Sequence, residues 1–311
     1  MVLDGHKDIV SGVTFSPDGS LLASSNEGTD SKVIVRQFPS GTILRSLATR
    51  RPGDHSINVL AFGYDGKRLA IGTTDGVIEV WDATNGELTT TLSCKPSVIT
   101  AIVFSRDGRT LFSADVYLKA RVRRWTIETG ADEIILSQPE SSGEFAIAPD
   151  ERTFVVGTLV GPMLWSMAQH DSPLMIGKQP DGICALAYSL DSRSFASTTR
   201  TPTMKIWDVT TRKEKATIHV DGEDISAIAF SPVDKSLLAA ACDRIGVTPG
   251  YITLWDVDSQ RQLVRRKAAK LYVTALAFSP DGKWLAVGAY DGTVKIWNVD
   301  KLLKAGVPKG N

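Results

Sequence analysis

The chain has 311 residues, of which 42% are hydrophobic and 23% charged, an ordinary composition for a soluble folded protein. Its 35 Lys and Arg residues balance its 35 Asp and Glu residues, which argues against a general binder of nucleic acids, because polyanion binding needs excess positive charge. No stretch approaches the length of a membrane-spanning helix, and no apolar signal core follows Met1. Cys94, Cys184 and Cys242 form no C-x-x-C pair, which favours reduced thiols and a cytoplasmic location.

Two in-phase series of aromatic residues reveal an internal repeat of about 42 residues. The first series consists of six tryptophans: Trp81, Trp125, Trp165, Trp207, Trp255 and Trp297. The second series consists of Phe15, Phe62, Phe104, Tyr188, Phe230 and Phe278. Its missing member would lie near Ala146–Ile147. A unit before the first tryptophan, with Arg36 at the tryptophan position, makes seven units in all.

The sequence pattern of each unit predicts four short consecutive strands. The first unit starts with Ile9–Thr14 and the turn Ser16-Pro17-Asp18-Gly19, in which Pro presets φ, Asp bonds its own backbone and Gly accepts a positive φ. In the second unit, the later strands are predicted over Leu69–Gly72, Val77–Asp82 and Glu87–Leu92. No unit offers an amphipathic stretch of helix length, so seven units predict about 28 strands and essentially no helix.

These units resemble the WD40 repeat family, and the resemblance covers nearly the whole chain. Trp-Asp pairs occur at Trp81-Asp82, Trp207-Asp208 and Trp255-Asp256, and Gly5-His6 matches the family's Gly-His position. The resemblance implies an all-β fold, a single seven-bladed β-propeller over residues 1–311 with four antiparallel strands per blade. The frequent Phe-Ser-Pro-Asp-Gly turns are similar to those of bacterial members or of large signalling proteins.

The family's hydrogen-bonded tetrad of His, Ser or Thr, Asp and Trp is largely missing here. The second unit has His55, Asp75 and Trp81, and the seventh has Asp291 and Trp297 without a histidine. Stability should therefore come mainly from apolar packing between blades. The side chains predicted to be largely buried are Trp81, Trp207, Trp255 and Trp297.

No catalytic machinery is apparent, so we expect no enzyme activity, no metal and no cofactor. The four histidines lack ligand spacing, and no P-loop, G-x-S-x-G or G-x-G-x-x-G motif lies in a strand–turn–helix context. The resemblance implies instead a scaffold that binds a protein or peptide, and we expect a monomer that binds neither nucleic acid nor membrane. The partner, the pathway and the organism are not readable from the sequence.

Candidate binding residues follow from the family's top-face positions, which lie four and six residues before the first-strand aromatic and just before the second turn Asp. Tyr272 and Tyr290 are the best candidates because aromatic residues dominate interface energetics; a packed structural tyrosine pair is the alternative. The other candidates are Ser11, Asn58, Thr74, Leu118, Arg200, Asp224, Ser226 and Thr274, with Ile9, Thr29, Ser56 and Thr100.

Two other classes of function stay open. One is an enzyme on a lactonase-like or peptidase-associated propeller, which shares Pro-Asp-Gly turns but needs converging His, Glu and Asp residues. The other is the interaction domain of a larger signalling protein. Two basic runs, Arg121–Arg124 and Arg265–Lys267, are expected to be solvated strand edges or the contact for an acidic partner.

Ring closure is predicted to be weak, because neither end of the chain supplies a full fourth strand for the last blade. Only Met1–Leu3 precede the first unit, and Gly306 and Pro308 interrupt the segment after Trp297. We expect either Met1–Leu3 or Leu302–Ala305 to form a short edge strand of blade 7. The short end also suggests that the natural chain extends upstream of Met1 or that this is an excised domain.

Overall fold

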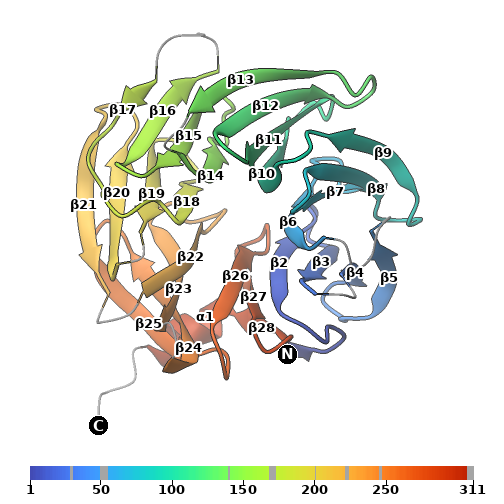
Figure 1. Cartoon of the computed structure of the whole chain (residues 1–311). Helices are drawn as coiled ribbons and strands as arrows, with labels where there is room; N and C mark the ends of the chain where they lie inside the picture. Colours follow the sequence, from blue (N-terminus) through green and yellow to red (C-terminus); the bar gives the residue numbers. More distant parts are fainter. Residues whose placement is uncertain are drawn as a thin grey trace.

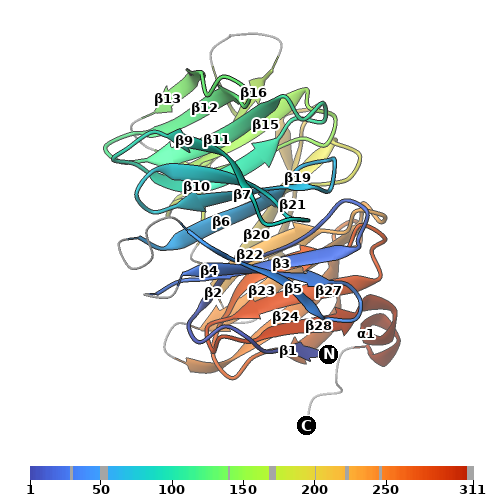
Figure 2. The same cartoon turned by 90° about the vertical axis from the view of Figure 1, so that its right-hand side faces the viewer.

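The computed structural model describes residues 1–28, 31–49, 55–138, 141–167, 173–199, 201–220, 224–244 and 247–306. These residues form 28 strands in seven antiparallel sheets of four, arranged as blades around a central axis (Figure 1). The seven-bladed propeller predicted from the repeat is therefore confirmed. Figure 2 shows the ring from the side, with the N-terminus next to the last blade.

Blades are numbered by the chain order of their innermost strands, which line the axis. Blade 1 contains β2 (Val10–Phe15), β3 (Leu21–Asn26), β4 (Lys32–Gln37) and β5 (Ile43–Ala48). Blade 2 contains β6 (Ile57–Phe62), β7 (Arg68–Thr73), β8 (Val77–Asp82) and β9 (Leu88–Ser93). Blade 3 contains β10 (Val98–Phe104), β11 (Thr110–Val116), β12 (Ala120–Thr126) and β13 (Asp132–Gln138). Blade 4 contains β14 (Ser141–Ile147), β15 (Thr153–Thr158), β16 (Pro162–Ser166) and β17 (Leu174–Met175).

The remaining three blades complete the ring. Blade 5 contains β18 (Ala185–Tyr188), β19 (Ser194–Thr198), β20 (Thr203–Asp208) and β21 (Lys213–His219). Blade 6 contains β22 (Asp224–Phe230), β23 (Leu237–Arg244), β24 (Val247–Asp256) and β25 (Arg261–Lys267), so the basic run of residues 265–267 lies in an outermost strand, as predicted. Blade 7 contains β26 (Val273–Phe278), β27 (Trp284–Ala289), β28 (Val294–Asn298) and β1 (Val2–Leu3).

The Ser-Pro-Asp-Gly sequences form the turns between first and second strands. In blade 1 the Ser16 hydroxyl donates to Asp18 at 2.6 Å and accepts the Leu21 amide at 2.9 Å, while Gly19 takes a φ of 71°. Ser279 and Asp281 repeat the first contact in blade 7 at 2.6 Å. The turn chemistry read from the sequence is thus the chemistry that closes these hairpins.

Apolar clusters between adjacent blades make up the core. The second strand of a blade lies between two neighbouring blades, so both of its faces are buried and its apolar residues need not alternate with polar ones. Leu69, Ala70 and Ile71 on β7 are all fully buried, with Leu69 and Ile71 facing blade 1 and Ala70 facing blade 3. The missing member of the aromatic series is Ile147, which pairs with Phe154 as Phe104 pairs with Leu111.

Burial of the repeat tryptophans is less uniform than predicted. Trp207 and Trp255 are buried as expected, and so are Trp125 and Trp165. Trp81 and Trp297 are only partly buried, which corrects the prediction for these two. They pack against the clusters of blades 1–2 and 6–7 from the periphery.

Strand β1 closes the ring as the outermost strand of blade 7. Val2 pairs with Lys295 and Leu3 with Val294, and the Met1 carbonyl accepts the Ile296 amide at 2.8 Å. Leu3 is buried in the cluster between blades 7 and 1. Of the two predicted closures, the N-terminal one is confirmed.

The segment proposed as the alternative closing strand is a helix, α1 (Val299–Ala305), so the expectation of essentially no helix is wrong at this end. The Asn298 side chain caps it by accepting the Lys301 amide at 2.9 Å. Val299 and Leu302, three residues apart, bury one face on the blade 6–7 cluster, and Gly306 ends the helix. Helical spacing of these apolar residues was the signal that the strand reading overlooked.

Candidate functional site

Five polar side chains, four on first strands and Cys184 just before β18, form a belt of hydrogen bonds from blade to blade around the axis. Each donates to a backbone carbonyl on the first strand of the next blade. The bonds are Asn58 Nδ2 to Ile99 O (2.7 Å), Thr100 Oγ1 to Gly143 O (2.6 Å), Cys184 Sγ to Ile225 O (3.4 Å), Ser226 Oγ to Val273 O (3.0 Å) and Thr274 Oγ1 to Val10 O (2.5 Å).

Sequence reasoning had selected four of these donors as candidate binding residues, namely Asn58, Thr100, Ser226 and Thr274. Their hydrogen bonds join neighbouring blades. The Ser11 hydroxyl instead bonds the Ser25 hydroxyl within blade 1 at 2.8 Å. Cys184 was missed, although it stands four residues before Tyr188, just as the others precede their aromatics. A role of these positions in partner binding stays a prediction, beside the structural contact they make here.

The turns between second and third strands place Thr74, Leu118 and Tyr290 at the opposite end of the blades from the Ser-Pro-Asp-Gly turns. Leu118 is 80% exposed, the largest value among the large apolar side chains of the described residues. Thr74 is also exposed, although its hydroxyl accepts the Ser56 amide at 3.0 Å. These side chains are therefore presented to solvent on one face of the ring.

Tyr272 and Tyr290 meet edge to face on this same end of blade 7. Their ring centroids are 4.8 Å apart at an interplanar angle of 70°, and the Tyr290 amide donates to the Tyr272 carbonyl at 2.9 Å. Tyr272 is partly buried, whereas Tyr290 is 40% exposed. The pair thus holds one aromatic ring in a defined orientation at the surface.

The other candidates are less informative. Asp224 begins β22, is partly buried and lies in register with Asp243. Ile9 is partly buried and accepts the Glu27 amide at 2.9 Å. Arg200 and Thr29 lie outside the described residues.

His55, Asp75 and Trp81 lie in one blade but do not form the family's tetrad. The Nδ1 atom of His55 is 4.0 Å from Asp75 and has no hydrogen-bond partner, and the Trp81 indole donates to Glu79 at 3.1 Å. The reason is that Ile71, paired with Glu79, occupies the position of the tetrad Ser or Thr. A cavity of about 250 Å³ lies beside these residues.

Asp75 instead pairs with Lys95 at 2.7 Å and accepts the Thr73 hydroxyl at 2.7 Å. Burial opposes its charged form, but Lys95, Thr73 and His55 outweigh burial and hold the pKa of the carboxyl below its usual value. This lysine follows β9, and sequence reasoning had no signal for it.

Tetrad-like contacts form in two blades where the sequence had not predicted them. In blade 3 the Trp125 indole donates to Ser113 at 2.8 Å. In blade 5 the Trp207 indole donates to Ser197 at 2.7 Å, and Ser197 donates to the buried Gln179. Gln179 lies nine residues before Tyr188, as His6 lies nine before Phe15, so the spacing was the available signal.

His6 itself is structural, as expected. Its ring contacts Ser24 at 2.8 Å and Asn26 at 3.2 Å. Burial, reinforced by the positive charge of Arg36, lowers the pKa of His6 to about 4. The imidazole is therefore neutral at physiological pH.

In blade 7, Asp291 accepts the Thr293 hydroxyl at 2.5 Å and shapes its turn, whereas the Trp297 indole nitrogen has no partner. Val287, paired with Lys295, stands where a tetrad Ser or Thr would be. The residues identified from the tetrad pattern thus act in turns and packing.

In the described residues, no group of three His, Cys, Asp or Glu side chains lies close enough to hold a metal ion. The thiols of Cys94 and Cys242 are buried, and burial raises the pKa of Cys94 to about 12. Within the same part of the chain, the seven-residue α1 is the sole helix, too short to cross a membrane.

Fold and repeat together define a WD40-type β-propeller. The family model described as WD domain, G-beta repeat matches residues 1–36 and 261–298, and the anaphase-promoting complex subunit 4 WD40 domain matches residues 29–107. These matches support the WD40 repeat family.

Proteins with similar sequences include two that match over nearly the whole of both chains and one that is much longer. The eukaryotic translation initiation factor 3 subunit I of Drosophila grimshawi is 22% identical over 320 residues, which cover 96% of both chains. The same subunit of Drosophila virilis is 23% identical and covers 96% of this chain and 97% of its own. Periodic tryptophan protein 2 of Arabidopsis thaliana is 24% identical over 242 residues, 78% of this chain but 22% of that protein.

Proposed function

We propose that this chain is a non-catalytic scaffold that binds a protein partner on the face carrying Thr74, Leu118 and Tyr290. The observation that carries the proposal is the Tyr272–Tyr290 pair, which holds an aromatic ring 40% exposed beside a second ring. A preoriented aromatic side chain loses little conformational entropy on binding and supplies a large contact area. The relatives support the proposal, because a translation initiation factor subunit is by name one component of an assembly.

The proposed contact set includes the remaining top-face positions, with the belt residues as secondary contacts. We place the protein in the cytoplasm as a monomer before it meets its partner. The formal charge balance agrees with a protein or peptide partner better than with a nucleic acid.

A quantitative capture experiment tests this face. Tyr290→Ala and Tyr272→Ala should each lower the recovery of specific partners from a native lysate several-fold. Tyr64→Ala is the matched control, because Tyr64 is an exposed tyrosine in a turn at the opposite end of blade 2. Equal recovery by all three variants would contradict the proposal.

The enzyme alternative has its own test. Purified protein should show no hydrolase or redox turnover with broad substrate panels. Turnover that survives repurification and disappears with a point substitution near the axis would show that the propeller is an enzyme.

A further inference from the structure

We propose that a surface over blades 3 and 4 binds a partner segment in which acidic residues alternate with apolar ones. This surface, the blade 3–4 patch, consists of Tyr117, Leu118, Leu159, Val160 and Met175. Blades 3 and 4 lie across the ring from blade 7 (Figure 1). Leu118 also belongs to the face proposed above, so the inference rests in part on the proposed function, but it does not use the Tyr272–Tyr290 contact.

The members of the patch are all exposed although they are large and apolar. Leu118 is 80% exposed, and Tyr117 and Leu159 are each more than half exposed. Exposed apolar groups scattered singly are ordinary, but a concentration of them marks an interaction site. Here five such side chains belong to two adjacent blades.

The patch is continuous within blade 4. Leu159 and Val160 form the turn after β15, and the Val160 carbonyl accepts the Gln179 amide at 2.9 Å. On β17, Met175 pairs with Met163, which packs on the blade 3–4 cluster, whereas Leu174 pairs with Leu164 and faces blade 5. The turn and Met175 therefore lie at the same corner of the blade.

The first residues of β14 connect this corner to blade 3. A Cβ added at Gly143 would lie 2.7 Å from the side chain of Val116, which precedes Tyr117. Ser141 lies in register with Thr158, which precedes Leu159. The two turns thus flank the same short stretch of backbone.

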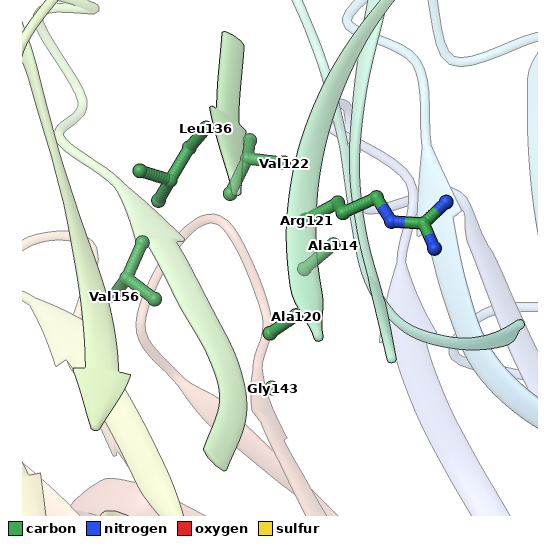
Figure 3. A pocket seen from close by; sticks show the side chains of 7 residues that line it. All are labelled: Ala114, Ala120, Arg121, Val122, Leu136, Gly143 and Val156. Atoms are coloured by element: carbon green, nitrogen blue, oxygen red, sulfur yellow. The ribbon is translucent and has the colours of Figure 1, made fainter. Parts of the chain in front are cut away.

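A narrow apolar crevice, which has no room for a water molecule, lies between the two blades below the patch (Figure 3). Ala114, Ala120 and Gly143 are among the residues that line it. Ala120 pairs with Val116, so the crevice lies directly below the turn that carries Tyr117 and Leu118. Apolar side chains of a bound segment would face an apolar wall here.

The charged side chains near the patch indicate which kind of partner segment it binds. In blade 3, Arg123 is neutralised by Asp115 and Asp132, and Arg124 by Glu133. Arg121, the remaining arginine of this run, has no ion-pair partner in the described part of the chain, and Figure 3 shows its side chain extending away from the crevice.

Lys119 and Lys178 are exposed and also lack ion-pair partners among the described residues. Lys119 follows Leu118, and Lys178 lies beside the Val160 turn, with Asp181 as the nearest acidic residue in that loop sequence. Because Arg121 points away, Lys119 and Lys178 are the two cations beside the apolar patch, and they complement carboxylates that flank apolar side chains. A basic or uncharged segment would lack this electrostatic attraction.

A direct binding measurement tests the inference with the full chain. The probe is a fluorescein-labelled twelve-residue peptide that alternates Leu or Phe with Asp or Glu, and the readout is fluorescence anisotropy. One companion peptide has Lys at every acidic position, and another has Ser at every apolar position. The acidic peptide should bind about ten-fold more tightly than either companion and should weaken as salt is raised.

Variants locate the site. Leu118→Ser and Val160→Ser should each weaken binding of the acidic peptide about five-fold, and Lys119→Glu should act similarly. Leu190→Ser is the matched control, because Leu190 is exposed in a Ser-x-Asp turn at the opposite end of blade 5. Tyr290→Ala should leave this binding unchanged, which separates the patch from the proposed tyrosine contact.

Several results would overturn the inference. These are binding of the lysine peptide as tightly as the acidic one, absence of binding by the acidic peptide, or an equal loss of affinity in Leu190→Ser. A dimer in sedimentation velocity that dissociates in Leu118→Ser would show that a second copy of the chain covers the patch. Circular dichroism should show unchanged folding of these surface variants.

Discussion

Glu144 is the residue that departs most from its repeat. It stands three positions before Ile147, where the other blades carry Gly12, Val59, Ala101, Ala185, Ala227 and Ala275. Residues at this position pack toward the following blade, so a carboxyl group is placed where small apolar groups normally fit. Burial raises the pKa of Glu144 to about 8.

This raised pKa predicts a pH-dependent stability. The unfolded chain ionises Glu144 near pH 4.5, whereas the folded chain resists ionisation until about pH 8. The free energy of unfolding should therefore fall as the pH rises through this window. Glu144→Gln should be more stable than the natural chain at pH 9 by on the order of 1–3 kcal/mol, and similar to it at pH 4.

Urea denaturation at several pH values measures this difference. Glu128→Gln is the control, because Glu128 is exposed in a turn of blade 3. If Glu144→Gln and Glu128→Gln show the same pH dependence as the natural chain, the carboxyl is solvated and the prediction fails.

At the scale of a single element, the third strand of blade 5 shows how one tryptophan fixes a blade. Trp207 on β20 is buried, stacks on Phe195 at 6.2 Å and donates to Ser197. A Cβ at Gly177 would lie 2.4 Å from its ring, so the neighbouring loop packs on it without a gap.

Trp207→Ala should therefore lower the free energy of unfolding by about 3–5 kcal/mol, because it leaves a cavity and removes the indole N–H that the buried Ser197 hydroxyl accepts. The comparison is Trp284→Ala, since Trp284 is outside the repeat series and only partly buried. Thermal or urea unfolding decides the outcome. A loss no larger than that of Trp284→Ala would mean that this blade is held by its flanking strands alone.

For the whole molecule, the outermost strand that closes the ring is short, because only Met1, Val2 and Leu3 bond or pair with β28. Edge pairing this short should open more readily than the central strands of other blades. Amides of blade 7 that face β1, such as that of Ile296, should exchange with solvent well before those of β7 and β11. Leu3→Ala should accelerate this exchange, because Leu3 is buried in the blade 7–1 cluster.

Hydrogen exchange followed by mass spectrometry resolves this order. The exchange rates of amides in blades 2 and 3 of the same protein serve as the internal reference. Uniform protection around the ring would mean that the seam is as strong as any other blade boundary.

Fold prediction succeeded because the signals are local in sequence. Each turn is specified by adjacent residues such as Ser16 and Asp18, and each inner strand by a short apolar run. Because the turn residues and the apolar strand recur in seven units, a closed seven-bladed ring is the architecture that buries the apolar strands of all the units. The strand prediction for the C-terminal segment was wrong because the spacing of Val299 and Leu302 suits either a strand edge or a helix face. Packing against the neighbouring blade decides between the two.

The candidate site was less predictable. The sequence placed Tyr272 and Tyr290 on one face, but their ring contact depends on how two turns of blade 7 fold against each other.

The sequence by itself determined the number of blades, the strand ranges and the turn chemistry, because these depend on contacts within a few residues. Tertiary structure decided which side chains are shared between blades. The Asn58 side-chain amide donates to Ile99 of the next blade, and Lys95 pairs with Asp75 in blade 2. Repeat spacing can mark the position of such a side chain, but its partner lies in another strand or blade and is fixed only when the strands and blades pack together.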